Sequence, residues 1–131
     1  DALCNALQVI NHLQDCADDY RNLDRVYLPS RWLADEGETV EALARPHASP
    51  GLRRVLDRCL AHTRELMGGA DHLPGVLKSR RLAMESAIIV AIAHKLIAEL
   101  ARRDPLAERI ELTRMQFLAC GAQGAVGGFF A

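Results

Sequence analysis

Four polar side chains near the start of the sequence recur at the spacing of one face of an α-helix. They are Gln8, Asn11, Asp15 and Asp19. At about 100° per residue they share an arc of roughly 80°, and the two carboxylates lie one turn, about 6 Å, apart along the axis. Mg²⁺ typically takes one or two carboxylates together with phosphate oxygens and water. The pattern therefore predicts that Asp15 and Asp19 hold Mg²⁺, which would bind a diphosphate and help it leave.

The other interpretation of this face is an ordinary solvated surface, and three observations count against it. Residues 1–20 contain four Asp and no Lys or Arg, whereas exposed helices usually mix both signs. Asp15, Asp18 and Asp19 fall in the last turns of the expected helix, where the helix dipole disfavours carboxylates. Asp and Asn are also mediocre helix formers. A local cost without a local reason favours a binding site, but from these residues alone both interpretations stay open.

The elements that must position these side chains are helices. Apolar residues at three- and four-residue steps predict a first helix over 1–20, with its apolar stripe opposite the polar face. We expect a connector over 21–29, a short helix near 30–35 stopped by Gly37, and a further turn near 39–44. A long helix is expected to begin at Ser49-Pro50, which form a good N-cap and first turn, and to end at Gly68-Gly69.

The second half predicts two more helices. After a break at 71–75, which contains Pro74, a long helix is expected over 79–103. Its centre, Ala87–Ala93, is apolar all round and is expected to be the most buried part of the fold. Asp104-Pro105 is expected to begin a last helix that runs to Cys120. Since no strand alternation or repeat is present, residues 1–131 are predicted to form a single all-α unit.

Composition excludes several classes of protein. Of the 131 residues, 50% are hydrophobic and 25% charged, which is typical of a folded domain and not of a disordered chain. The net charge of −1 argues against a nucleic-acid partner. The longest apolar run, Ala87–Ala93, is too short to span a membrane, although association with a membrane surface is left open. The sequence begins without Met and ends in an apolar, glycine-rich stretch, so we expect a fragment of a longer protein.

The cysteines and histidines form no metal or redox motif. We expect the thiols to be buried and reduced, as suits a cytoplasmic protein. The residues are Cys4, Cys16, Cys59, Cys120, His12, His47, His62, His72 and His94.

The polar face and the residues after it resemble the second aspartate-rich motif of the squalene/phytoene synthase family. The similar pattern is Q-x-x-N-x-x-x-D-x-x-x-D followed by R-V-Y-L-P, which here begins at Gln8 and includes Arg25, Tyr27, Leu28 and Pro29. The break at Leu73-Pro74 before a long apolar helix is similar to the family's layout. Residues 11–20 look most like the bacterial hopanoid-pathway branch, of the hydroxysqualene synthase type.

The resemblance implies the all-α terpenoid synthase fold, of which this chain would be the C-terminal portion with about four to six helices. It implies a synthase of isoprenoid biosynthesis that acts on farnesyl or presqualene diphosphate, with Mg²⁺ held by Asp15 and Asp19. Gln8 and Asn11 would contact the diphosphate or metal-bound water, and Arg25 and Tyr27 the diphosphate side. In the hydroxysqualene branch, water captures the carbocation. His12, on the same face, is a further candidate substrate contact.

Two departures from the family pattern keep other functions open. The first aspartate-rich motif is absent, so the fragment alone is not expected to be active. A Tyr-Arg pair that the family often carries is replaced by Ala93-His94-Lys95. Such a chain is also compatible with a non-catalytic homologue that serves as a binding or assembly protein, or with a helical module whose acidic face binds a basic partner. The oligomeric state is not indicated.

The remaining candidates have structural interpretations that we prefer. The basic cluster at Lys78, Arg80 and Arg81 is typical of a solvated helix start, with a second phosphate contact as the alternative. His94 and Lys95 are expected to find polar partners within the bundle. Trp32 is expected to anchor the short helix. The G-x-x-G spacings at Gly121, Gly124, Gly127 and Gly128 indicate close helix packing or a flexible end.

Overall fold

The computed structural model describes residues 2–72, 75 and 79–129, with side chains of residues 2–72, 75 and 79–126. In these parts the chain forms α-helices and one 3-10 helix, and no strand. The predicted all-α fold is therefore confirmed. The long helices are α1 (Ala2–Leu23), α3 (Pro50–Ala70), α5 (Arg80–Arg102) and α6 (Arg114–Phe129); α2 (Ser30–Asp35) and η1 (Val40–Ala44) are short.

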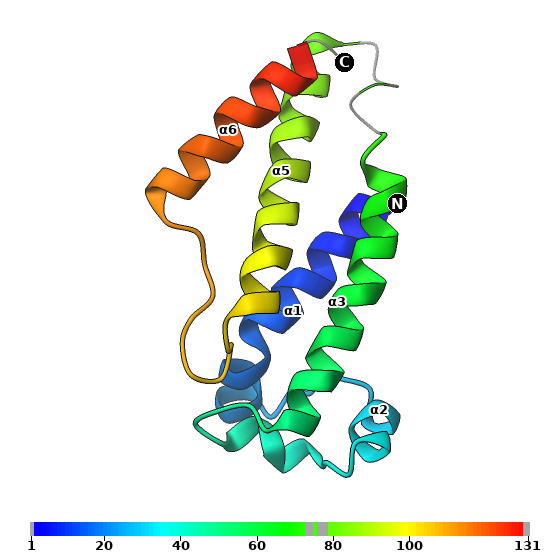
Figure 1. Cartoon of the computed structure of the whole chain (residues 1–131), viewed down its shortest axis with the longest axis vertical. Coiled ribbons are helices and arrows are strands. Elements are labelled where there is room, and N and C mark those ends of the chain that lie inside the picture. The colour runs from blue at the N-terminus through cyan, green and yellow to red at the C-terminus, as the bar shows by residue number, and fades with distance from the viewer. Residues whose placement is uncertain (1, 73–74, 76–78, 130–131) are drawn as a thin grey trace.

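The long helices pack side by side (Figure 1). Helix α3 runs antiparallel to both α1 and α5, while α6 crosses back over the first part of α5. The short elements α2 and η1 close the end of the bundle at which α3 begins. The core is built from one face of each of α1, α3 and α5, together with Leu33 and Leu43 from the short elements.

Local capping signals explain several helix starts. The Ser49 hydroxyl accepts a hydrogen bond from the Leu52 N–H at 3.1 Å, with Pro50 in the first turn. Ser79 caps α5 in the same way through the Leu82 N–H, at 3.4 Å. Gly37 has a φ of +70° just after α2, a conformation that glycine adopts without strain. These predicted boundaries are confirmed.

Two predicted helix ends are wrong, and at the end of α3 the reason is a tertiary contact. Helix α1 continues past residue 20 to Leu23. Helix α3 continues through Gly68 and Gly69 to Ala70, which is buried against the core. The Asp71 N–H extends the helical pattern by donating to the Met67 carbonyl at 2.8 Å. Burial of Ala70 compensates for the weak helix propensity of the two glycines. The predicted Leu73-Pro74 break lies outside the described residues.

The last helix does not begin at Pro105, as the sequence predicted. Residues 105–107 form only a turn, and 109–113 are irregular. The turn is held by Asp104, which accepts from the Leu106 N–H at 2.9 Å and from the Ala48 N–H at 2.8 Å. Helix α6 begins at Arg114 because Thr113 and Gln116 form a reciprocal capping box, with hydrogen bonds of 2.8 and 3.2 Å.

The apolar centre of α5 is not the most buried part of the fold, which corrects a further expectation. Ile89 is exposed, and most of Ala87–Ala93 is only half-buried. Along this stretch α6 covers one side of α5 and leaves a cavity beside it, so the apolar side chains line a surface and do not fill a core. The fully buried hydrophobic residues of α5 lie mostly toward its C-terminal end, at Ala93, Leu96, Ile97 and Leu100, and Ala83 is buried near its start.

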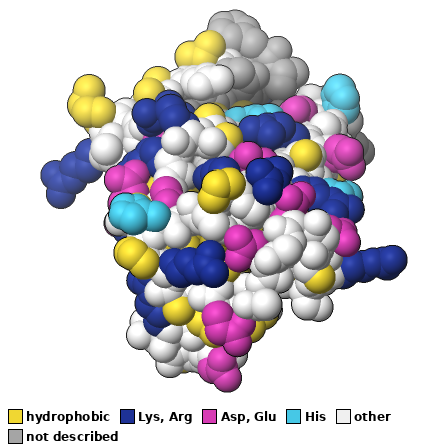
Figure 2. Space-filling view, turned by 60° about the horizontal axis from the view of Figure 1, so that its bottom comes forward, with side chains coloured by type: hydrophobic (Ala, Val, Ile, Leu, Met, Phe, Trp, Pro, Cys, Tyr) yellow, Lys and Arg dark blue, Asp and Glu magenta, His cyan; other side chains and the backbone are white. Residues whose placement is uncertain are grey.

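The surface of the molecule carries charges of both signs. Basic and acidic side chains are interspersed on the face seen in Figure 2, without a large area of one sign. None of the helices in the described part of the chain has the length and apolar character that a bilayer crossing requires.

Cys16, Cys59 and Cys120 are buried as expected, but Cys4 is exposed. Burial raises the pKa of the Cys16 thiol to about 12 and that of Cys59 to about 11.

Candidate functional site

Helix α1 carries the four polar residues singled out from the sequence on its outer side. The helix is continuous over all four, so their shared face follows from its geometry. Gln8 and Asn11 are exposed, whereas Asp15 and Asp19 are half-buried. The opposite side of α1 is buried in the core, which holds this polar face outward.

The connector after α1 folds back onto this face. Asp24 has a φ of +50°, a left-handed conformation that Asp tolerates better than most residues. The Arg25 N–H then donates to the Asp19 carbonyl at 3.1 Å. The Tyr27 ring stacks on His12, with ring centres 4.0 Å apart and planes at 3°. The connector thus brings two further predicted site residues against α1.

Tyr27 also holds one of the two carboxylates. Its hydroxyl donates a hydrogen bond to Oδ2 of Asp19. This bond, and secondarily burial, raises the pKa of Tyr27, and the nearby Arg25 charge partly offsets the rise. The phenol therefore keeps its proton and remains a donor, while His12 fixes the position of its ring.

Arg109 contacts this polar face, and it was not predicted from the sequence. Its guanidinium lies 2.5 Å from Oδ1 of Asp15 and 3.6 Å from Oδ2 of Asp18. The Gln14 side chain donates to the Ile110 carbonyl at 2.8 Å, so the irregular segment before α6 is attached along the second half of α1. Hydrogen bonding to Asp15 raises the pKa of Arg109, which stays charged. Arg109 and Asp15 are 94 positions apart in the sequence, so no local sequence pattern predicts their contact.

The donor chemistry of this face fits a hard divalent cation. Asp15 and Asp19 supply carboxylate oxygens, and Asn11 and Gln8 supply amide oxygens, all of the type Mg²⁺ prefers. In the described residues no group of three or more His, Cys, Asp or Glu is assembled as a metal site. Two carboxylates are within the number that a protein usually gives to Mg²⁺, with phosphate and water completing the shell.

The other candidates behave largely as the structural interpretations predicted. Arg81 pairs with Glu85 at 3.1 Å on an exposed helix start, and Lys78 lies outside the described residues. The Arg58 guanidinium lies over the Trp32 ring, with its central carbon 4.1 Å from the ring centre. Trp32 thereby anchors α2 to α3. Lys95 pairs with the buried Glu99 at 3.5 Å. Polar partners within the bundle were expected for Lys95, and this is confirmed.

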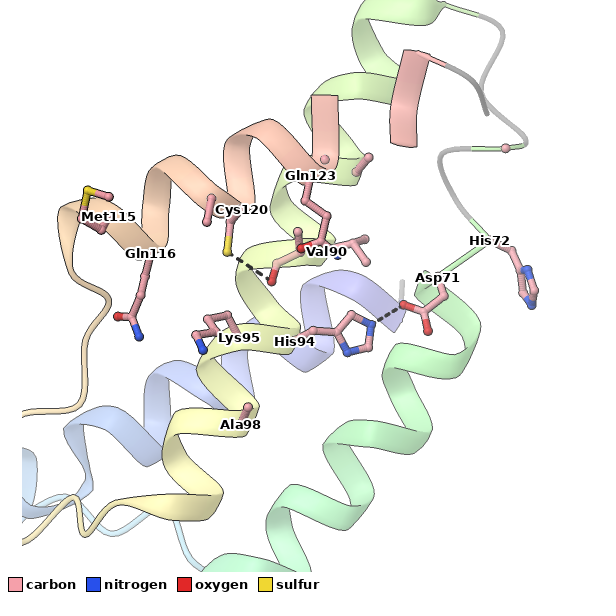
Figure 3. A pocket seen from close by; sticks show the side chains of 15 residues that line it. Asp71, His72, Val90, His94, Lys95, Ala98, Met115, Gln116, Cys120 and Gln123 are labelled. Atoms are coloured by element: carbon pink, nitrogen blue, oxygen red, sulfur yellow. Dashed lines mark hydrogen bonds and ion pairs between the residues drawn. The ribbon is translucent and has the colours of Figure 1, made fainter. Parts of the chain in front are cut away.

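A cavity of about 1160 Å³ lies between α5, α6 and the end of α3. Val90, Ala91 and Ala119 give it an apolar wall, while Asp71 and His94 lie on its α3 side (Figure 3). The helices come very close at Gly124, where a Cβ would lie 2.5 Å from the Ile88 nitrogen. The expected close packing at a glycine is thus confirmed at Gly124, whereas Gly121 faces open space.

Comparison with known proteins places the chain in a family. Residues 1–116 match the family model described as squalene/phytoene synthase. The chain belongs to the squalene/phytoene synthase family.

Among individual relatives, the hydroxysqualene synthase of Zymomonas mobilis is 38% identical over 131 residues, which cover 100% of this chain and 44% of that protein. The hydroxysqualene synthase of Rhodopseudomonas palustris is 42% identical over 118 residues, with coverages of 90% and 40%. The chain thus spans about two fifths of the length of these relatives. A bifunctional lycopene cyclase/phytoene synthase of Colletotrichum graminicola is 40% identical over 73 residues, 53% of this chain and 12% of that protein. No solved structure gives a significant match.

Proposed function

We propose that this chain forms the diphosphate-binding wall of an isoprenoid synthase of the hydroxysqualene synthase type, acting on farnesyl or presqualene diphosphate. The observation that carries the proposal is the outer face of α1. There Asp15 and Asp19 lie one turn apart, with Arg109 paired to Asp15 and Tyr27 bonded to Asp19. Membership of the squalene/phytoene synthase family and 38–42% identity to hydroxysqualene synthases support the same assignment.

In this proposal each residue of the face has a distinct role. Asp15 and Asp19 hold Mg²⁺, which neutralises the charge that develops on the leaving diphosphate. Gln8 and Asn11 bind the diphosphate or metal-bound water.

The basic and aromatic residues beside this face act on the diphosphate side. Arg109 and Arg25 carry guanidinium groups that can form bidentate hydrogen bonds with phosphate oxygens. Tyr27, backed by His12, orients the Asp19 carboxylate.

The apolar cavity beside α5 has the character needed for the hydrocarbon part of such a substrate. Its volume of about 1160 Å³ slightly exceeds the range of about 300–1,000 Å³ usual for small-molecule pockets. An apolar wall protects a carbocation from uncontrolled reaction with water.

The test is to replace each acidic residue by its amide in the complete protein. Asp15→Asn and Asp19→Asn should each lower Mg²⁺-dependent diphosphate release by more than about 100-fold, because the lost charge acts where negative charge builds up. Asp35→Asn is the control, since Asp35 is an exposed carboxylate on α2 that pairs with Arg58 at 3.5 Å. Helix content by circular dichroism should be unchanged in all three.

Three outcomes would overturn the proposal. Full activity in both Asp15→Asn and Asp19→Asn would show that α1 does not carry the metal site. A folded wild-type protein that releases no diphosphate from either substrate would favour the non-catalytic binding or assembly homologue. A third outcome, salt-sensitive binding of a basic partner without any dependence on Mg²⁺, would favour the acidic interaction module.

A further inference from the structure

A histidine–aspartate pair lies at the α3 side of the α5–α6 cavity. Nε2 of His94, on α5, is 2.6 Å from Oδ1 of Asp71, which directly follows α3 (Figure 3). Both residues line the cavity, and their side chains remain 48% and 43% exposed. The pair therefore stands in contact with the space beside the apolar wall and with solvent, where a water molecule can reach it.

The hydrogen bond determines which histidine nitrogen is available. An ionised carboxylate only accepts hydrogen bonds. Nε2 of His94 is therefore protonated and donates the hydrogen bond to Asp71. In the neutral ring, Nδ1 is then a proton acceptor. Within the described part of the chain the His94 side chain forms no hydrogen bond or ion pair other than that to Asp71. This is the arrangement in which a carboxylate orients an imidazole for use as a general base.

The neighbouring charged residue, Lys95, does not compete with His94 for Asp71. Lys95, the next residue and also in the cavity lining, directs its ammonium to Glu99 at 3.5 Å. Asp71 therefore has His94 as its polar side-chain partner among the described residues. His72 lines the same rim and is exposed. The cavity lining also contains small and apolar residues on α5, among them Val90, Ala91 and Ala98, and the uncharged amides of Gln116 and Gln123 on α6.

We infer that His94 is the catalytic base that takes a proton from the water molecule captured by the substrate carbocation, and that Asp71 is its positioning residue. The inference rests on the proposed function and names a residue for the step that makes the product an alcohol. The juxtaposition that carries the inference is a His94–Asp71 pair in the lining of a cavity that also has an apolar wall of Val90, Ala91 and Ala119.

The step balances without any oxidant or reductant. The bond between carbon and the diphosphate oxygen breaks, and its electron pair leaves with the diphosphate. A lone pair of water forms the new carbon–oxygen bond. One water proton passes to Nδ1 of His94 and later to solvent, while Asp71 stabilises the imidazolium through Nε2. The products are the alcohol, diphosphate and one proton.

The experiment separates water capture from ionisation. The complete protein is incubated with presqualene diphosphate and Mg²⁺, and both released diphosphate and the ratio of alcohol to hydrocarbon products are measured. His94→Gln should lower the alcohol fraction by about tenfold or more, since positioned bases contribute roughly 10²–10⁴-fold. Diphosphate release should stay within about threefold of wild type, because ionisation does not use His94. Asp71→Asn should shift the products in the same direction, and Asp71→Glu should restore much of the alcohol fraction.

His62→Gln is the matched control, because His62 is an exposed histidine on α3 that stacks on Trp32 and is not part of the cavity lining. An unchanged product ratio in both His94→Gln and Asp71→Asn would overturn the inference. An equal loss of diphosphate release and alcohol would mark the pair as structural and also overturn it. Wild-type protein that releases diphosphate but forms no alcohol would overturn this inference and leave the ionisation step of the proposed function standing.

Discussion

The guanidinium of Arg109 lies 2.5 Å from the carboxylate of Asp15, although 94 positions separate the two residues in the chain. The contact attaches the irregular segment before α6 to the polar face of α1. It also places a permanent positive charge beside the proposed metal ligands, where a diphosphate would be bound.

Replacing Arg109 is expected to weaken substrate binding more than folding. Arg109→Gln should raise KM for the prenyl diphosphate by about 10- to 100-fold, the equivalent of one charge-assisted hydrogen bond of roughly 1.5–3 kcal/mol. Arg109→Lys should be intermediate, since lysine keeps the charge and loses the planar fork. Steady-state kinetics of the complete protein check this. A lower melting temperature with an unchanged KM would instead make Arg109 a purely structural contact.

The Tyr27–Asp19 hydrogen bond is expected to give a pH-dependent contribution to stability. The pKa of Tyr27 is raised above its ordinary value of 10.0, chiefly by this bond. Stability from a raised pKa is fully present below the unfolded value and is lost as pH rises through the folded one. The melting temperature of Tyr27→Phe should therefore lie below that of wild type up to about pH 10, and the two should converge above it. Tyr20→Phe leaves the bond to Asp19 in place and serves as control; a difference independent of pH would contradict the prediction.

The crossing of α5 and α6 should be sensitive to a single methyl group. In Gly124→Ala the new Cβ would lie 2.5 Å from the Ile88 nitrogen and 2.8 Å from the Ala87 carbonyl carbon. Because backbone cannot give way as a side-chain end can, we expect a loss of about 1–3 kcal/mol in the free energy of unfolding. Gly121→Ala is the matched change on the same helix, with nothing within 4 Å, and should stabilise by up to about 1 kcal/mol. Equal effects of the two substitutions would show that the helices do not approach as described.

The buried Glu99 should contribute to stability at neutral pH and lose that contribution in acid. It is 2% exposed and is bonded by Arg102 at 2.7 Å, Arg103 at 3.1 Å and Gln116 at 3.2 Å. Burial raises its pKa, but the hydrogen bonds from Arg103 and Arg102 outweigh burial and hold the pKa below its usual value. The stabilisation is thus present above the unfolded pKa, near 4.5, and is lost as pH falls through the lower folded value.

Glu99→Gln should therefore destabilise the protein by about 2 kcal/mol at pH 7, with a smaller difference at pH 3. Glu85→Gln is the control on the same helix, because Glu85 and its partner Arg81 are 53% and 88% exposed, and should cost about 0–1 kcal/mol. Urea unfolding at the two pH values measures both. An equal loss in the two variants would place Glu99 among ordinary surface carboxylates.

The elements with local signals were predictable from the sequence. The apolar stripe of α1 and the serine caps at Ser49 and Ser79 correspond to helices that the structure contains. The polar face of Gln8, Asn11, Asp15 and Asp19 was equally readable, because helix periodicity alone determines which residues share a side. The start of α6 was also encoded locally, in the capping box at Thr113 and Gln116, but was missed in favour of Asp104-Pro105.

What the sequence could not supply was contact between distant segments. The continuation of α3 through Gly68 and Gly69 depends on burial of Ala70, and the half-exposure of the apolar stretch in α5 depends on where α6 crosses it. The pairs Arg109–Asp15 and His94–Asp71 join residues 94 and 23 positions apart. The sequence by itself thus determined the helices and the acidic face, since these follow from local periodicity and capping. Only the tertiary structure decided which cation faces Asp15 and which carboxylate orients His94, because packing alone brings those segments together.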